Sequence, residues 1–503
     1  MTKIASVEFG KWRSFFWPIH THELKKLLPM FFMFFFISFV YSLLRNTKDA
    51  LLITAPGSGA EAIPFLKVGG VVPAAILFML MYAKLSNILS KEKLFYATII
   101  PFIVFFALFA LVLYPGKEFL HPTIAADKLQ QYLPDGLSGL VATFRNWTYS
   151  LFYIFAELWG SFILSLLFWG FANDITRVTE AKRFYALFGL GANLALMAAG
   201  PAASYIAQLQ SGSEISGDPW QTPLNYLMFI AVISSLCIMV IYRWINKNVL
   251  TDARFYDQTE QVRVKKDKPK MSMKESFLFL ARSRYLLCIA LLVLSYNISI
   301  NLLEVTWKGQ LKLLYPNKAD YLSFMGTYST LLGATTIFMM LFVSSNVLRR
   351  FGWAVTAYIT PIVLLITGAG FFGFIIFKEP LSPFLTTLSL SPLFIAVIFG
   401  TAQNIMSKAA KYSLFDPTKE MAYISLDQES KVKGKAAIDT VGARLGKAGG
   451  SGIQLGLITI FGSLSAVTPH IGIIMFVIIG VWLWAIKHLN EIEFKKIEKQ
   501  NAS

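Results

Sequence analysis

The chain has 503 residues, of which 55% are hydrophobic and 15% charged, and its mean hydropathy is +0.56. This composition is typical of an integral membrane protein and excludes a string of soluble domains. The two cysteines, Cys237 and Cys288, both lie in apolar runs, which excludes a disulfide framework and a CxxC metal site.

The net charge of +17, from 46 Lys and Arg against 29 Asp and Glu, has two explanations. Cytoplasmic loops of membrane proteins are basic because loop charge sets topology. Alternatively, cations line a cleft that attracts an anionic solute. Charges inside the membrane-spanning helices would support only the second explanation.

Windows of about 20 mostly apolar residues, the length that crosses a hydrocarbon core, recur twelve times along the chain. The basic segment 1–27 leads straight into the first window, so we expect a retained helix rather than a cleaved secretory signal. The windows lie near residues 28–48, 65–85, 94–114, 147–171, 184–207, 224–245, 285–307, 322–344, 353–377, 388–411, 436–463 and 466–488.

Lys and Arg collect in every second connection between these windows, which predicts that those connections are cytoplasmic. Both termini then lie on the cytoplasmic side, as an even number of spans requires. The basic residues are Lys91 and Lys93, then Arg177, Lys182 and Arg183, then Arg349 and Arg350, and finally Lys431, Lys433 and Lys435.

The longest polar stretch, residues 246–284, is predicted to be a cytoplasmic basic linker. It separates an N-terminal six-helix bundle, 28–245, from a C-terminal six-helix bundle, 285–490, and a cytoplasmic tail follows at 491–503. Each bundle has a Gly-rich fifth helix, at 188–200 and 441–452. We therefore predict an all-α membrane protein of two bundles, the arrangement of transporters whose site lies between the bundles.

Five of the windows carry polar residues at intervals of three or four, which places each set on one helical face. The sets are Ser38, Tyr41, Ser42, Arg45 and Lys48, with Asp49 beside them; Tyr149, Tyr153, Glu157, Ser161 and Ser165; Asn297, Asn301, Glu304 and Lys308; Thr401, Asn404, Lys408 and Lys411; and Thr440, Arg444, Lys447, Ser451 and Gln454.

Facing lipid, the six charges Arg45, Lys48, Glu157, Glu304, Arg444 and Lys447 would together cost about 15 to 20 kcal/mol. Such a cost exceeds the total stability of most proteins. The charges therefore pair with one another, as Arg45 and Asp49 could at i and i+4, or they line a shared polar cavity. Because five of the windows carry such a polar face, the shared cavity is the better explanation. Glu157 and Glu304 could also serve as proton relays.

Cations in such a cavity suit anions with several oxygens, above all phosphates, because Arg binds two oxygens at once and Lys acts as a point charge. The segment GARLGKAGG is one residue too short for a phosphate-binding loop, so no ATPase site is expected. The five histidines show no metal-ligand spacing. We expect neither a metal nor a cofactor.

Seven long motifs carry a resemblance to a known family: RNTKDALL (45–52), GSGAEAIPFLK (57–67), AELWGS (156–161), FWGFANDITRVTEAKRFYALFGLGAN (168–193), INLLEVTWK (300–308), KYSLFDPTKEMAYISLD (411–427) and RLGKAGG (444–450). The chain resembles the nucleotide transporters of obligate intracellular bacteria and plastids, the ATP/ADP translocases. The resemblance implies twelve helices in a major-facilitator-like fold.

It further implies exchange of imported ATP for ADP and phosphate across a bacterial inner membrane, and four essential charges at Lys48, Glu157, Glu304 and Lys447. Asn46 stands where the family commonly has Asp, and Ala448 where related chains often have Ser, which leaves substrate preference open. Members of the family also carry GTP, UTP, CTP or NAD.

The resulting hypothesis is a monomeric ATP/ADP antiporter in the lipid bilayer that works by alternating access and has no nucleic-acid partner. Phosphates would bind among Arg45, Lys48, Arg444 and Lys447, and the base against Tyr153, Asn301 or Asn404. One alternative is a proton-coupled importer that uses Glu157 or Glu304. Another, a membrane-embedded transferase, lacks a catalytic His–carboxylate constellation in the sequence.

Overall fold

The computed structural model describes residues 19–209, 218–252, 255, 275, 283–387, 389–423, 426 and 428–501. Some side chains inside these ranges, chiefly in 428–447 and 493–501 and including Arg444 and Lys447, lie outside the described part. Every regular element within the described ranges is helical and none is a strand, which confirms the predicted all-α class.

The N-terminal half, residues 21–248, contains six long helical segments in its described part. These are α2 (Leu24–Ile53), preceded by η1 (Thr21–Glu23); α3 (Ala62–Leu66), η2 (Lys67–Val71) and α4 (Val72–Ile88); α5 (Lys91–Leu108) and η3 (Phe109–Leu113); α9 (Trp147–Leu158), η5 (Trp159–Phe168) and α10 (Trp169–Ile175); α11 (Val178–Gln208); and α12 (Gln221–Asn248). The short helices α6 (Lys117–Leu120), α7 (Thr123–Tyr132), η4 (Asp135–Leu137) and α8 (Ser138–Arg145) join the third segment to the fourth.

The C-terminal half, residues 284–501, follows the same pattern. Its helices are α15 (Arg284–Leu314); α16 (Lys318–Phe338) with η7 (Met339–Val343); α17 (Ser344–Ile376); α18 (Lys378–Thr387); α19 (Pro392–Ala410) with η8 (Lys411–Phe415) and α20 (Asp416–Ala422); α21 (Gln428–Phe461); and α22 (Leu464–Asn501). Most of the predicted linker lies outside the described residues, so the predicted division into bundles stays a prediction.

Eleven helical segments in the described residues are long and apolar enough to cross a membrane. The twelfth, predicted at 436–463, coincides with α21, in which only Ala448–Phe461 forms a short apolar stretch. The break before the last span lies at Gly462, two residues before the gap between the predicted windows, and the φ of Gly462, +88°, is in the left-handed region that favours glycine. Glycine can therefore end α21 in this conformation before α22 begins at Leu464.

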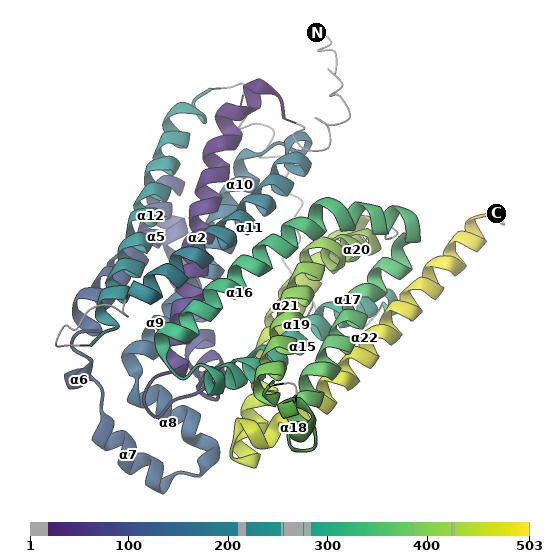
Figure 1. Cartoon of the computed structure of the whole chain (residues 1–503). Helices are drawn as coiled ribbons and strands as arrows, with labels where there is room; N and C mark the ends of the chain where they lie inside the picture. The colour runs from purple at the N-terminus through teal and green to yellow at the C-terminus, as the bar shows by residue number, and fades with distance from the viewer. Residues whose placement is uncertain are drawn as a thin grey trace.

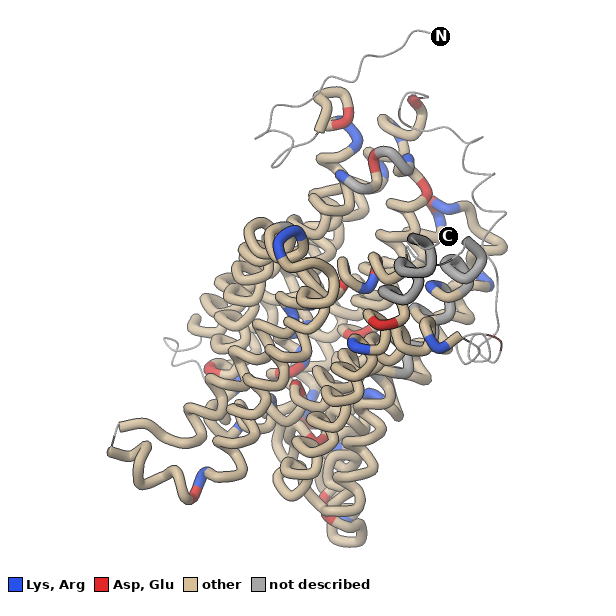
Figure 2. Tube along the Cα trace, turned by 90° about the vertical axis from the view of Figure 1, so that its right-hand side faces the viewer, with Lys and Arg blue, Asp and Glu red and all other residues tan. Residues whose placement is uncertain are grey.

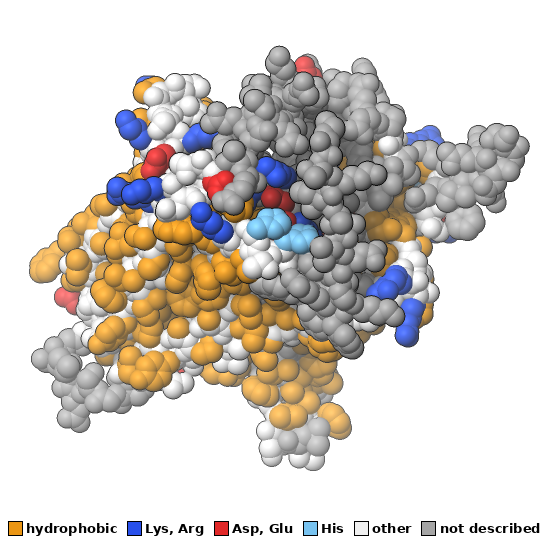
Figure 3. All heavy atoms as spheres, turned by 90° about the horizontal axis from the view of Figure 1, so that it is seen from above, with side chains coloured by type: hydrophobic (Ala, Val, Ile, Leu, Met, Phe, Trp, Pro, Cys, Tyr) orange, Lys and Arg blue, Asp and Glu red, His pale blue; other side chains and the backbone are white. Residues whose placement is uncertain are grey.

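Large apolar side chains are exposed on the flanks of the molecule. No residue of α4 is buried, and Ile76, Leu77 and Leu80 are all more than half exposed. Figure 3 shows hydrophobic side chains covering much of the flank that is in view. Water does not stabilise such a surface whereas lipid does, and the chain is a multi-pass membrane protein.

The two ends of the molecule differ in what they contain. Helix α2 begins and α22 ends at the upper end of Figure 1, which we call the terminal end. The short helices α6, α7 and α8 lie at the opposite, far end. Because α2 and α15 each cross from the terminal end to the far end, charges at similar depths on these two helices can meet.

The two halves touch at several depths. Helices α11 and α16 run antiparallel, since Gly200 lies against the Gly326 carbonyl oxygen and Gly333 lies near the Asn193 carbonyl oxygen. At the far end, Gly136 of η4 approaches the backbone of α21, and the Lys312 ammonium donates to the Ser58 carbonyl oxygen. The halves are thus in contact at the far end.

Candidate functional site

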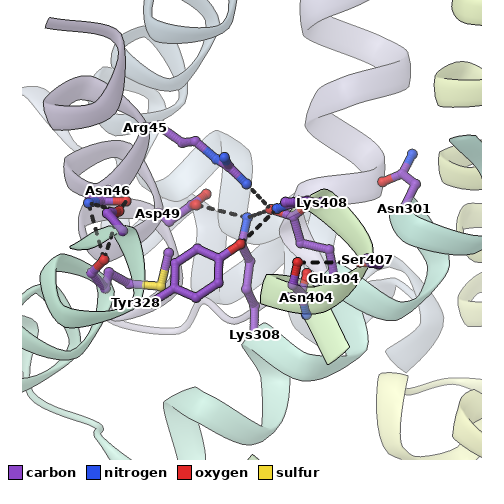
Figure 4. A network of polar contacts seen from close by, with 12 residues as sticks. Arg45, Asn46, Asp49, Asn301, Glu304, Lys308, Tyr328, Asn404, Ser407 and Lys408 are labelled. Atoms are coloured by element: carbon purple, nitrogen blue, oxygen red, sulfur yellow. Dashed lines mark hydrogen bonds and ion pairs between the residues drawn. The ribbon is translucent and has the colours of Figure 1, made fainter. Parts of the chain in front are cut away.

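Charged side chains from both halves meet inside the helices. Figure 2 shows charged positions partway along the bundle as well as at its ends. Arg45 Nη2 on α2 donates to Glu304 Oε1 on α15 over 2.9 Å. Lys408 Nζ on α19 lies 3.2 Å from the other oxygen, Glu304 Oε2. Glu304 therefore collects cations from both halves, as Figure 4 shows.

A second carboxylate, Asp49, links the same two helices. Its Oδ1 lies 2.8 Å from Lys48 Nζ, and its Oδ2 lies 2.8 Å from Lys308 Nζ. Lys308 Nζ is also 3.0 Å from Glu304 Oε1, one helical turn away on α15. Asp49 is fully buried, so neither of its cations can replace it with water.

A third carboxylate, Glu157, comes from α9. Its Oε1 lies 3.1 Å from Lys48 Nζ, and this ammonium also stands 3.7 Å from the centroid of the buried Tyr153 ring. Such a contact with an aromatic face stabilises a desolvated cation. Helix α9 then passes into the π-helical segment η5 at Trp159, a local irregularity that is often found at functional sites.

The charged side chains of the site form ion pairs, but part of their surface remains exposed. The side chains of Arg45, Glu157 and Glu304 are 20%, 31% and 16% exposed although they lie inside membrane-spanning segments. The alternative in which Arg45 pairs with Asp49 along α2 is wrong, because Arg45 pairs with Glu304 and Asp49 pairs with two lysines. Ion pairs thus coexist with partly exposed side-chain surface.

Lys67, the first residue of η2, forms a separate bridge. Its Nζ donates to Asn301 Oδ1 on α15 over 2.9 Å, and Asn301 Nδ2 donates to Ser451 Oγ on α21 over 3.0 Å. Gly450 of α21 leaves room for the Asn301 side chain, because a Cβ there would stand only 3.0 Å from the Asn301 Cβ. Figure 4 shows Asn301 to one side of the cluster around Glu304.

Helix α16 adds two further polar contacts to the site. The Lys408 ammonium donates to the Tyr328 hydroxyl over 3.0 Å. Asn46 Nδ2 donates to Ser329 Oγ over 2.9 Å, which ties α2 to α16. An amide can both donate to Ser329 and accept from it, so Asn46 fits this position.

The structure brings four of the predicted site residues, Arg45, Lys48, Glu157 and Glu304, into one network. Two more adjoin it, since Tyr153 lies beneath Lys48 and Asn301 holds Lys67. Asn404 is buried and its amide donates to Gly400 of its own helix. Arg444 and Lys447 belong to α21, but their side chains lie outside the described residues.

The predicted polar stripes include Lys308 and Lys408, and Asp49 lies beside one of them, but periodicity alone did not mark these three as site residues. Their ion pairs place them in the network. Sequence reasoning missed Lys67, because it stands alone at the start of its apolar window and resembles an ordinary interfacial lysine. Its hydrogen bond to Asn301 places it beside the network.

The balance of charged side chains indicates which kind of ligand this site can bind. Its described cations outnumber its described carboxylates by five to three: Arg45, Lys48, Lys67, Lys308 and Lys408 against Asp49, Glu157 and Glu304. An excess of positive charge in a low-dielectric setting attracts anions. The arrangement is therefore suited to binding an anion between the two halves.

Comparison with known proteins gives the family. The model of the TLC ATP/ADP transporter family matches residues 2–494. The chain belongs to this family. Members of this family are membrane transporters, so the protein is a transporter and not an enzyme.

Similar proteins occur in bacteria and plants. An ADP,ATP carrier protein 1 of Chlamydia pneumoniae is 58% identical over 98% of this chain and 96% of its own length. A chloroplastic ADP,ATP carrier protein 1 of Arabidopsis thaliana is 50% identical over 94% of this chain and 74% of its own length. An ADP,ATP carrier protein 1 of Rickettsia bellii is 45% identical over 95% of both chains.

Solved structures of other transporters share the fold. A D-xylose–proton symporter superposes with a TM-score of 0.53 at 14% identity, over 93% of this chain and 97% of that one. A bacterial homologue of the iron transporter ferroportin, in an inward-facing state, gives 0.55 at 13% identity, over 95% and 99%. Identity this low supports the fold alone, and the predicted major-facilitator-like fold is confirmed.

Proposed function

We propose that the protein exchanges ATP for ADP, and phosphate with it, across a membrane by alternating access. The observation that carries the proposal is the convergence of cations from both halves on Glu304 and Asp49. The names of the carriers from Chlamydia and plastids point to the same two nucleotides. Phosphate oxygens would replace these carboxylates as partners of the cations.

The same contacts give a physical reason for exchange. Arg45–Glu304 and Lys308–Asp49 join α2 to α15 and so hold the two halves together. Breaking such pairs without a substitute would leave uncompensated charges inside the protein, which is costly. A bound polyphosphate supplies the substitute, so the halves rock only when the site is loaded.

Residue roles follow from this scheme. Arg45, Lys48, Lys308 and Lys408 would contact phosphates, and Arg444 and Lys447 of α21 would add to them. Glu157 and Glu304 would hold the cations in place between transport cycles. The base would rest against Tyr153, Asn301 or Asn404, which lie around the charged residues and offer an aromatic face or amide groups.

The proposal also includes an orientation. The protein would lie in a bacterial inner membrane. Both termini would be on the cytoplasmic side, because Lys and Arg collect in the connections on that side. The far end would then face away from the cytoplasm. The protein would act as a monomer, since both halves of the site come from one chain.

A counterflow assay tests this function. Vesicles containing the purified protein are loaded with ADP or left empty and are then given labelled ATP. Uptake should require internal ADP, and Lys48→Gln should lower it about tenfold or more, because a charged hydrogen bond is lost. Lys84→Gln is the matched control, since Lys84 is exposed on α4. Uptake into empty vesicles under a pH gradient would instead support the proton-coupled importer.

The same vesicles distinguish the remaining alternative. Labelled GTP, UTP, CTP and NAD are offered in turn to vesicles that contain ADP. Preference for one of these over ATP would make the protein an exchanger of other nucleotides.

A further inference from the structure

Lys67 differs from the other described cations of the network. Arg45, Lys48, Lys308 and Lys408 each have a carboxylate within ion-pair distance. Within the described part of the chain, Lys67 makes one polar contact, to the neutral carbonyl oxygen of Asn301. None of the described carboxylates therefore lies within ion-pair distance of Lys67.

The surroundings of Lys67 place it beside the network. It opens η2, a π-helical segment that continues through Gly70. A Cβ at Gly70 would stand 3.0 Å from the Ile154 side chain of α9, the helix that carries Glu157 one turn further on. On its other side, Lys67 reaches α15 through Asn301. Lys67 thus stands between the two halves.

A cation in this position needs an explanation. A lysine inside a membrane-spanning segment costs a few kcal/mol unless an anion or water stabilises it. An amide carbonyl compensates only part of that cost, because it carries no net charge. A site that is loaded with a polyanion during transport would supply the missing charge.

We propose that Lys67 is a phosphate-binding residue of the carrier. Its Nζ would exchange Asn301 Oδ1 for an oxygen of the nucleotide's phosphate chain, an inference that rests on the proposed nucleotide exchange. The exchange of partners breaks the hydrogen bond that joins η2 to α15. Asn301 keeps its bond to Ser451 and is released to move with α21.

The test measures anion binding apart from transport. Purified wild type, Lys67→Gln, Lys67→Arg and the exposed control Lys84→Gln are titrated with ATP, inorganic tripolyphosphate and adenosine. Lys67→Gln should weaken ATP and tripolyphosphate binding about tenfold or more, the usual effect of losing one charged hydrogen bond. Adenosine binding should not change. Lys67→Arg, which keeps the charge, should stay within about threefold of wild type.

A structural role would give a different result. If Lys67 only ties η2 to Asn301, then Lys67→Gln would lower the unfolding temperature and leave tripolyphosphate affinity at the wild-type value. That outcome overturns the inference. If Lys67→Gln does not fold, Asn301→Asp decides the question, because it gives Lys67 an internal carboxylate. Asn301→Asp should also weaken tripolyphosphate binding about tenfold, and unchanged affinity would overturn the inference.

The two proposals can fail separately. A wild-type protein that binds tripolyphosphate through Lys67 but does not exchange ADP for ATP would refute the proposed function alone. A wild-type protein that exchanges the two nucleotides, while Lys67→Gln keeps full affinity, would refute the role of Lys67 alone.

Discussion

Asp49 is the single residue on which most of the network depends. It is fully buried and serves as counter-ion to Lys48 on its own helix and to Lys308 on α15. A neutral side chain here would remove a negative partner from both lysine charges in a place that water does not reach. Glu304, by contrast, is partly exposed and shares its charge among three cations.

We therefore expect Asp49→Asn to lower the free energy of unfolding by about 3 kcal/mol, the usual effect of removing one partner from a buried ion pair. Thermal unfolding in detergent measures the loss. The matched control is Asp174→Asn at the exposed pair with Lys91, where the change should stay below about 1 kcal/mol. Equal losses in the two variants would contradict the importance of Asp49.

Sequence periodicity could predict which side chains enter the site but not which of them pair. The stripes on α2, α9 and α15 contained Lys48, Glu157 and Glu304, because a charge inside a membrane span must face protein or water. The pairing of Arg45 with Glu304 depends on how α2 and α15 cross. Lys67 gave no periodic signal, since it is one charge at the start of an apolar window.

The crossing of α11 and α16 is a close approach between helices of the two halves. Gly200 and Gly326 face each other there, and a Cβ at either position would collide with the carbonyl oxygen of the other. Neither backbone can yield without separating the helices. Small residues at such contacts allow close packing in membranes.

We expect Gly200→Leu to force these helices apart and so to lower both the unfolding temperature and the exchange rate. Its matched control is Gly480→Ala on α22, because a Cβ there meets nothing within 4 Å. Alanine should leave stability unchanged or raise it, since it favours a helix more than glycine does. Normal exchange by Gly200→Leu would show that the crossing is not a close-packed contact.

Helices followed from apolar windows because a helix satisfies its own backbone hydrogen bonds within lipid. The break between α21 and α22 was also predictable, and Gly462 explains it. The π-helical segments η2 and η5 were not predictable, because they depend on tertiary contacts that shift hydrogen bonding by one residue. The short helices α6, α7 and α8 lie outside any apolar window, so hydropathy gave no signal for them.

For the molecule as a whole, twelve apolar windows divided by a central polar linker predicted a two-bundle transporter. Similarity to other transporters confirms that fold. Hydropathy could not predict how the halves touch, because contacts at the far end, such as Lys312 with Ser58, join residues distant in sequence. If alternating access operates, these contacts must open and close during transport.

A disulfide across the far end tests that motion. A Cβ built at Gly309 of α15 stands 3.7 Å from the Cβ of Ala60, which suits a disulfide. In a protein whose Cys237 and Cys288 are replaced by serine, oxidation of Ala60→Cys/Gly309→Cys should stop exchange, and reduction should restore it. Each single cysteine variant is a control. Full exchange with the disulfide formed would show that this contact stays closed during transport.

The central claim is that nucleotide phosphates replace carboxylates as partners of cations from both halves. A structure of the protein with ADP bound tests it most directly. We expect phosphate oxygens within about 3 Å of Arg45 or Lys48 on one half and of Lys308 or Lys408 on the other. Phosphates bound elsewhere, with Arg45 still on Glu304 and Lys308 still on Asp49, would contradict it.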